Sequence, residues 1–125
     1  GEVLRVQADP VQLVQVILNL LRNAFAAVGG NPPGARAVQV TVARRTDGHA
    51  EIAVCDDGPG VPPDMARRLF EPFASTSPEG LGLGLAISRA IVEAHGGRMW
   101  TAANAPRGAV FAFSLPLAGG AADAA

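Results

Sequence analysis

The chain contains no lysine, and all ten of its basic residues are arginines. This absence excludes two kinds of nucleotide site, because a P-loop needs a lysine after its second glycine and an ordinary protein kinase needs a strand lysine that contacts the phosphates. Charge is also scarce: 17% of the 125 residues are charged, and the formal net charge is -1. Because no large positive field is available, neither nucleic acid nor an anionic membrane surface is an expected partner.

Cysteine is nearly absent as well. Cys55 is the one cysteine, so no internal disulfide can form, and its strand-like surroundings predict a small buried side chain in a reducing compartment. No apolar run approaches the eighteen or more residues of a membrane span, and no signal-peptide pattern opens the chain. We therefore expect one core in a domain that makes no membrane contact.

The pattern of apolar residues and turn signals predicts an α+β fold. Asp9 and Pro10 are start signals, and a glycine pair is a stop signal, for a long and mostly buried helix over residues 11–28. The other expected elements are an edge strand over 1–7, strands over 38–44 and 51–55 around a turn at 46–49, a short helix from 62 to about 69, a helix over 86–95, and strands over 98–103 and 109–115.

These elements predict a two-layer α/β sandwich, with about three helices on one face of a mixed, mostly antiparallel sheet of about five strands. Residues 71–80 carry little periodicity and are expected to form a mobile loop. Residues 1–117 are expected to form the domain, and residues 118–125 a flexible tail.

The polar residues of the long helix lie on one narrow stripe. Gln15, Asn19 and Asn23 follow one another at i, i+4 and i+8, and the stripe carries amides where a solvent face usually carries charges. An amide oxygen is a ligand that Mg²⁺ accepts beside phosphate oxygens and water. The stripe is either a ligand face or the solvated edge of a core helix, since periodicity alone does not separate the two.

Two glycine-containing segments follow. Asp56, Gly58 and Gly60 lie in a turn after a predicted strand, where a carboxylate can accept a hydrogen bond from the amino group of adenine and reject the carbonyl of guanine. Residues 80–85 alternate glycine and leucine before a helix, so that free N–H groups can hold phosphate at the helix N-terminus. An ordinary tight turn and a flexible hinge are the alternatives.

In combination and in this order, the three features resemble the ATP-binding domain shared by gyrase, the heat-shock ninety chaperones, sensor histidine kinases and the mismatch-repair ATPases, often called the Bergerat fold. Residues 15–24 resemble its N box, 56–60 its first glycine box, 69–73 its F box and 80–85 its second glycine box. The resemblance covers residues 8–116 and is greatest for histidine kinases, particularly the nitrogen-regulation and dicarboxylate-sensing type.

The resemblance implies a catalytic domain that presents the γ-phosphate of Mg-ATP to a histidine on a separate dimerisation domain, with a response regulator downstream. It implies that Asn23 binds Mg²⁺, that Asp56 binds the adenine amino group, and that Asn19 lies near the phosphates as the catalytic residue. The other nucleotide-binding residues that it implies are Gly58, Gly60, Phe70, Gly80, Leu81, Gly82, Leu83, Gly84 and Leu85. It also implies a cytoplasmic domain, monomeric when isolated, whether or not the parent protein is anchored in the inner membrane.

Departures from the family pattern bear on activity. Gyrase-like ATPases carry a glutamate where Asn19 stands, and an amide cannot take a proton from water, so fast ATP hydrolysis is not expected. Relatives with a short lid often carry a lysine near Ser77, which this chain lacks, and Asp57 replaces the usual asparagine. The missing lysine lowers the expected affinity for phosphate. Asp57 repels the phosphates if it faces them, and salt screens its charge if it faces water.

Three alternatives remain open at this level. They are a serine kinase of the anti-sigma type, a stand-alone ATPase, and a nucleotide-binding docking module without transfer activity. Arg89 is either a phosphate partner or a solvated helix residue. His49 and His95 lack the setting of the acceptor histidine of the family, and each is expected to have a structural or solvent role.

Overall fold

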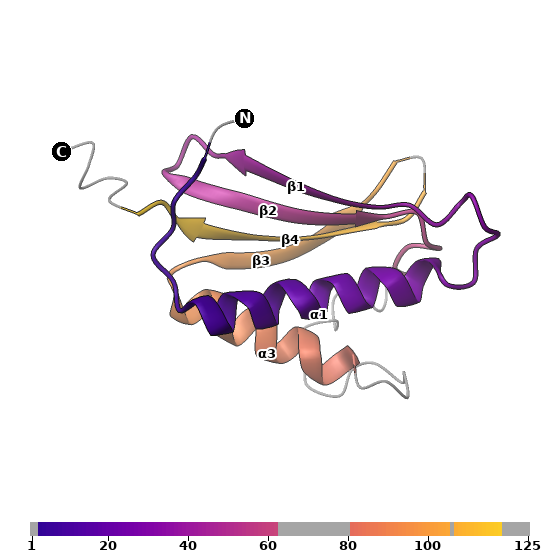
Figure 1. Ribbon diagram of the computed structural model, residues 1–125, viewed down its shortest axis with the longest axis horizontal. Coiled ribbons are helices and arrows are strands. Elements are labelled where there is room, and N and C mark those ends of the chain that lie inside the picture. The colour runs from indigo at the N-terminus through magenta and orange to yellow at the C-terminus, as the bar shows by residue number, and fades with distance from the viewer. Residues whose placement is uncertain (1–2, 63–80, 106, 119–125) are drawn as a thin grey trace.

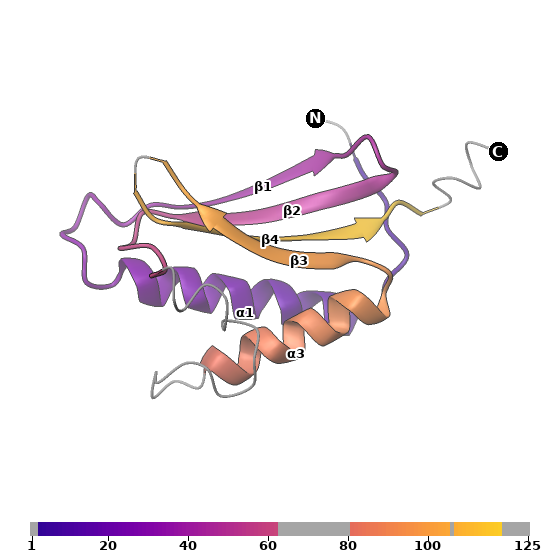
Figure 2. The ribbon, with the colours of Figure 1, turned by 180° about the vertical axis from the view of Figure 1, so that it is seen from behind.

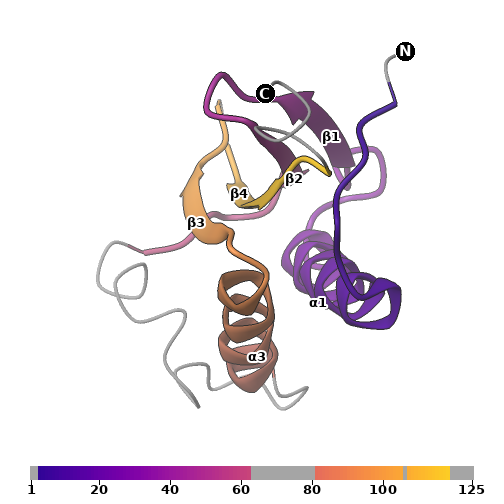
Figure 3. The same ribbon diagram turned by 90° about the vertical axis from the view of Figure 1, so that its left-hand side faces the viewer.

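The computed structural model describes residues 3–62, 81–105 and 107–118, which form a two-layer α/β sandwich. Four antiparallel strands lie in the order β1-β2-β4-β3. Both helices cover the same face of this sheet (Figures 1, 2 and 3). The elements are α1 (Pro10–Val28), β1 (Val38–Arg44), β2 (His49–Asp56), α3 (Leu81–Ala94), β3 (Arg98–Ala103) and β4 (Ala109–Pro116). The predicted fold class is confirmed.

The predicted strands agree closely with the sheet, with one exception. β1 and β3 have the expected bounds, and β2 and β4 are longer than expected by up to two residues at an end. The predicted edge strand over 1–7 is wrong, because this segment contributes only an isolated bridge between Val6 and Leu117. The predicted helix at 62–69 and loop at 71–80 lie almost wholly outside the described residues, and so does the tail beyond residue 118.

The start of α1 follows the expected capping pattern. The Asp9 carboxylate accepts hydrogen bonds from the N–H groups of Val11 at 2.9 Å and Gln12 at 3.2 Å, and Pro10 occupies the first turn. These bonds satisfy two of the donors that every helix N-terminus leaves without a partner. At the other end the N–H of Gly29 donates to the carbonyl of Ala26, so the predicted stop is also confirmed.

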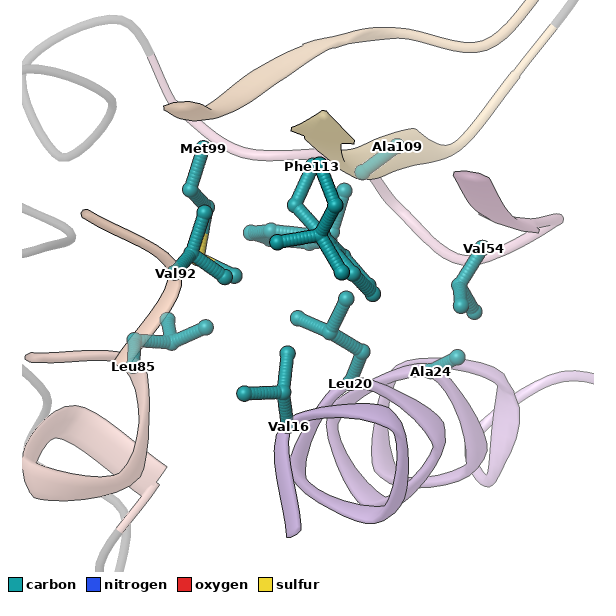
Figure 4. Packing of buried hydrophobic residues seen from close by; sticks show 11 residues of the cluster. Val16, Leu20, Ala24, Val54, Leu85, Val92, Met99, Ala109 and Phe113 are labelled. Atoms are coloured by element: carbon teal, nitrogen blue, oxygen red, sulfur yellow. The ribbon is translucent and has the colours of Figure 1, made fainter. Parts of the chain in front are cut away.

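The core lies between the inner face of the sheet and the two helices (Figure 4). Val16, Leu20 and Ala24 recur every four residues on α1 and are fully buried, which is the spacing of one helix face. They pack against apolar side chains from the sheet and from α3, namely Val54, Leu85, Val92, Met99, Ala109, Phe111, Phe113 and Leu115. This packing fixes α1 on the sheet and so fixes the direction of its polar stripe.

The outer face of α1 corrects the expectation of a mostly buried helix. Val11, Val14, Leu18 and Phe25 are between 49% and 76% exposed, because the sheet covers only the opposite side of the helix. By length and composition alone, α1 is long and apolar enough to cross a membrane, contrary to the expectation that the chain has no apolar segment of that length. Length and composition alone do not make it a span, because core helices of globular domains pass the same test.

Helix α3 begins earlier than predicted. It starts at Leu81 instead of residue 86, so most of the second glycine box forms the first turns of the helix. Two contacts favour this conformation: the Leu85 side chain is 3% exposed in the core, and the Asn19 amide donates to the Gly84 carbonyl. The helix ends at Ala94, and a Cβ on Gly97 would lie 1.7 Å from the Ser114 carbonyl oxygen, so only glycine fits after the predicted stop.

Candidate functional site

Asp56 ends β2 as a buried carboxylate that is only partly satisfied. It is 1% exposed, and its Oδ1 accepts hydrogen bonds from the N–H groups of Gly58 at 2.8 Å and Ala109 at 3.3 Å. Its Oδ2 is also buried and has no hydrogen-bond partner among the described residues. Since an unpaired buried acceptor is costly, an orphaned oxygen at the edge of the core indicates a place for an external N–H donor.

Gly58 is required by close packing against α1. A Cβ at this position would lie 2.9 Å from both the Cβ and the carbonyl oxygen of Ala27, which real Cβ atoms do not tolerate. Gly60 has a φ of 83°, in the left-handed region that favours glycine. The first glycine box is therefore a rigid turn held against the end of α1, and the two predicted glycines serve its shape.

One face of α1 connects the two glycine boxes. Asn19 donates from Nδ2 to the Gly84 carbonyl at 3.4 Å and to the Ser88 hydroxyl at 3.0 Å, both on α3. Ala27, two turns further along the same face, contacts Gly58. Asn23 lies midway between them and is partly exposed. The structure thus brings Asn19, Asn23, the first glycine box and the start of α3 together along one side of the helix.

The described residues fit adenine and a magnesium ion in different ways. The adenine amino group matches the free Oδ2 of Asp56, as an N–H donor facing an acceptor. No group of three or more His, Cys, Asp or Glu side chains in the described ranges could enclose a metal ion. Mg²⁺ bound with a nucleotide needs few protein ligands, because phosphates and water supply the rest, and the Asn23 amide oxygen suits that role.

Several predicted site residues are not described fully. Phe70 and Gly80 lie outside the described residues, as does Ser77. Of Leu81, Gly82 and Leu83 the structure describes the helical backbone, and the N–H groups of a first helical turn have no carbonyl partner within the helix. The Leu85 side chain belongs to the core, so only its backbone can face a ligand.

In the described contacts, Arg89 and His95 meet other parts of the fold and not the candidate site. Arg89 pairs with Glu93 at 3.1 Å on the exposed side of α3, as expected of a solvated helix residue. His95 accepts a hydrogen bond at Nε2 from the Asp9 N–H at 3.1 Å, and its Nδ1 lies 2.7 Å from the Ile91 carbonyl. This histidine joins the end of α3 to the start of α1, which confirms its structural role.

The thiol of Cys55 is less buried than predicted, since the residue is of intermediate exposure on the sheet. Partial burial raises the pKa of this thiol, and the neighbouring charge of Asp56 raises it further by a smaller amount. Cys55 is therefore a protonated, weakly reactive side chain at neutral pH.

Sequence reasoning missed the residues that hold the first glycine box from behind. Asn31 and Arg107 both donate hydrogen bonds to the backbone carbonyl of Asp57, and Arg107 also donates to the backbone carbonyl of Gly58. Asn104 donates from Nδ2 to the Asp56 carbonyl at 2.8 Å. Arg107 also donates to Asn31, which lies 76 residues away in the chain, so no local spacing could have indicated these contacts.

Comparisons with known proteins identify the family of the chain. Residues 8–119 match the family model described as histidine kinase-, DNA gyrase B-, and HSP90-like ATPase. The chain is 46% identical over 113 residues to the sensor protein FixL of Bradyrhizobium diazoefficiens, covering 90% of the chain and 22% of FixL. It is 42% identical to the sensor histidine kinase ZraS of Klebsiella oxytoca, covering 92% of the chain and 24% of ZraS.

Solved structures give the same result. The nucleotide-free catalytic domain of histidine kinase ThkA has a TM-score of 0.77 at 37% identity, over 89% of this chain and 70% of that domain. Full-length ShkA in complex with AMPPNP also has a TM-score of 0.77, at 35% identity, over 92% of this chain and 23% of ShkA.

The fold and the site define an ATP-binding domain, and the chain belongs to the family of histidine kinase-, DNA gyrase B- and HSP90-like ATPases. Its relatives are sensor kinases, and within the family it is a catalytic ATP-binding domain of the sensor histidine kinase type. The chain spans about a quarter or less of the length of the curated relatives named above.

Proposed function

We propose that residues 1–117 bind Mg-ATP and present its γ-phosphoryl group to a histidine on a separate dimerisation domain. The observation that carries this proposal is the buried Oδ2 of Asp56, which has no hydrogen-bond partner in the described part of the chain and matches the amino group of adenine as an acceptor. Asn23 would hold the magnesium ion, which neutralises phosphate charge, and Asn19 would lie beside the phosphates at the start of α3.

The transfer itself needs positioning more than acid–base chemistry. The bond between the γ-phosphorus and the bridging oxygen of ATP breaks, a bond from an imidazole nitrogen to that phosphorus forms, ADP leaves, and the imidazole releases its proton. Asn19 and Gln15 are amides, which cannot act as a general base for water. These two positions therefore do not promote hydrolysis of bound ATP before the imidazole reacts. A monomeric domain in the cytoplasm, where ATP is available, suits this role.

Nucleotide titration of the Asp56→Asn variant tests the adenine site. The two N–H donors on Oδ1 need an acceptor, so the new amide nitrogen would face the adenine amino group, donor against donor. Loss of one charge-assisted hydrogen bond predicts that the ATP dissociation constant rises by about 10- to 100-fold, measured by calorimetry with Mg²⁺ present.

The matched control is Asp47→Asn, in the exposed turn before β2, which should leave ATP affinity unchanged. GTP should bind the wild-type chain more weakly than ATP. Equal affinity of the wild type and the Asp56→Asn variant for ATP would contradict the adenine site.

Phosphoryl transfer is tested by mixing the chain with separate acceptor domains and radiolabelled ATP. We expect an acid-labile, base-stable phosphohistidine on a helical dimerisation domain, from which a response regulator receives the phosphate. A phosphoserine on a protein partner would indicate the anti-sigma type of kinase instead. ATP binding without any transfer would indicate a docking module.

A further inference from the structure

Asn31 and Arg107 form a hydrogen-bonded network behind the adenine carboxylate. Arg107 donates from Nε to the carbonyls of Asp57 at 3.2 Å and Gly58 at 3.1 Å, and from Nη2 to Asn31 Oδ1 at 3.2 Å. Asn31, which is 7% exposed, donates from Nδ2 to the Asp57 carbonyl at 2.8 Å and to the Ala35 carbonyl at 2.7 Å. We call these contacts the Asn31–Arg107 network.

The network joins three parts of the chain that surround the first glycine box. Asn31 is anchored to the end of α1, because its N–H donates to the Val28 carbonyl at 3.0 Å. Arg107 comes from the loop between β3 and β4. The Asp57 carbonyl, which shares a peptide group with the Gly58 N–H, and the Gly58 carbonyl of the next peptide group are therefore both held by side chains that are remote in sequence.

The position of this peptide determines which oxygen of Asp56 is free. The N–H of Gly58 donates to Oδ1 at 2.8 Å and the N–H of Ala109 donates to it at 3.3 Å, so that these two bonds orient the carboxylate, and Oδ2 has no partner among the described residues. If the Gly58 N–H moves, the carboxylate can rotate, and its free oxygen is no longer directed by the turn. Neither Asn31 nor Arg107 contacts Asp56 itself through a side chain in the bonds described, so both act through the turn.

We propose that Arg107, together with Asn31, is a positioning residue that sets the preference of the site for the adenine amino group. The proposal rests on the proposed function, since it presumes that Asp56 binds adenine. Guanidinium geometry is essential to it, because the planar fork reaches two carbonyls and an amide oxygen at once, whereas a lysine offers a single point charge.

The test compares ATP with inosine triphosphate, in which an oxygen replaces the adenine amino group. The two nucleotides carry the same phosphate charge, so the ratio of their dissociation constants reports on recognition of the base edge, where the 6-amino group and N1 of adenine become a 6-oxygen and an N1–H. We expect Arg107→Ala and Arg107→Lys to reduce the preference for ATP by about fivefold, the effect of one net hydrogen bond, mainly through weaker ATP binding. Calorimetric titration of the 125-residue chain with Mg²⁺ gives both constants.

The matched control is Arg98→Ala, which removes the same charge from an exposed position at the start of β3. It should leave the ratio unchanged. An unchanged ratio in both Arg107 variants would overturn the proposal, even if both dissociation constants rise together, because that result indicates lost phosphate attraction or general destabilisation. Equal binding of ATP and inosine triphosphate by the wild-type chain would instead contradict the proposed adenine site itself.

Discussion

The two oxygens of Asp56 have different tasks. Oδ1 accepts hydrogen bonds from the backbone of its own turn and of β4, and Oδ2 is buried with no partner among residues 3–62, 81–105 and 107–118. A carboxylate divided in this way can recognise a donor without reorganising, because its geometry exists before the ligand arrives. Specificity at this site therefore depends as much on the residues that hold Oδ1 as on the oxygen that meets the base.

Gly58 provides a test of packing at the residue scale. A Cβ at Gly58 would lie 2.9 Å from Ala27, so Gly58→Ala forces α1 and the turn apart and is expected to lower the free energy of unfolding by about 1–3 kcal/mol. Urea unfolding followed by circular dichroism measures the change.

The matched control for that experiment is Gly30→Ala. Nothing lies within 4 Å of a Cβ there, so the free energy of unfolding should change little. If both alanine variants were equally stable, the close approach of Gly58 to α1 would not be a constraint on the fold.

At the scale of elements, α3 begins five residues earlier than the sequence predicts. Glycines at 82 and 84 predict a loop, because glycine in a helix costs about 1 kcal/mol relative to alanine. The tertiary contacts of Asn19 with Gly84 and of Leu85 with the core outweigh that cost. Local composition cannot reveal such a balance, since the decisive partner lies 65 residues away.

Gly84→Ala separates the folding role of this glycine from its role in binding. A Cβ at Gly84 meets Asn19 at 3.6 Å, an ordinary contact, so the variant should raise the free energy of unfolding by about 0.5–1 kcal/mol through better helix propensity. ATP affinity should fall, because the side chain obstructs the approach of phosphate to the first turn. Thermal unfolding and calorimetry on the same sample check both changes. A variant that is more stable and binds ATP as well as the wild type would argue against phosphate binding at this turn.

For the whole molecule, the order and type of most elements follow from the sequence, because each strand and helix carries its own start, stop or periodicity signal. The caps of α1, the glycine stop of α3 and the bounds of β1 and β3 are examples. The candidate site could be proposed from the sequence only where it coincides with local motifs, as for Asn19, Asn23 and Asp56. Asn31 and Arg107 could not be found in this way, because their contacts exist only after the chain has folded.

The exposure of the apolar face of α1 could not be predicted from the sequence either. Helical periodicity indicates that valines, leucines and Phe25 form an apolar surface, but not that the sheet covers only part of it. How much of a helix is covered depends on the number of neighbouring elements, which is a property of the assembled layers.

Helix α1 also fixes the distance between the two ends of the candidate site. Asn19 contacts the start of α3, and Ala27 contacts the turn that follows Asp56, so eight residues of rigid helix, about 12 Å, separate the two ends of the site. A ligand that is shorter than this span can engage one end or the other but not both. A nucleotide that engages both ends, as the proposed function requires, must span about this distance between its base and its phosphates, because a single uninterrupted helix fixes it.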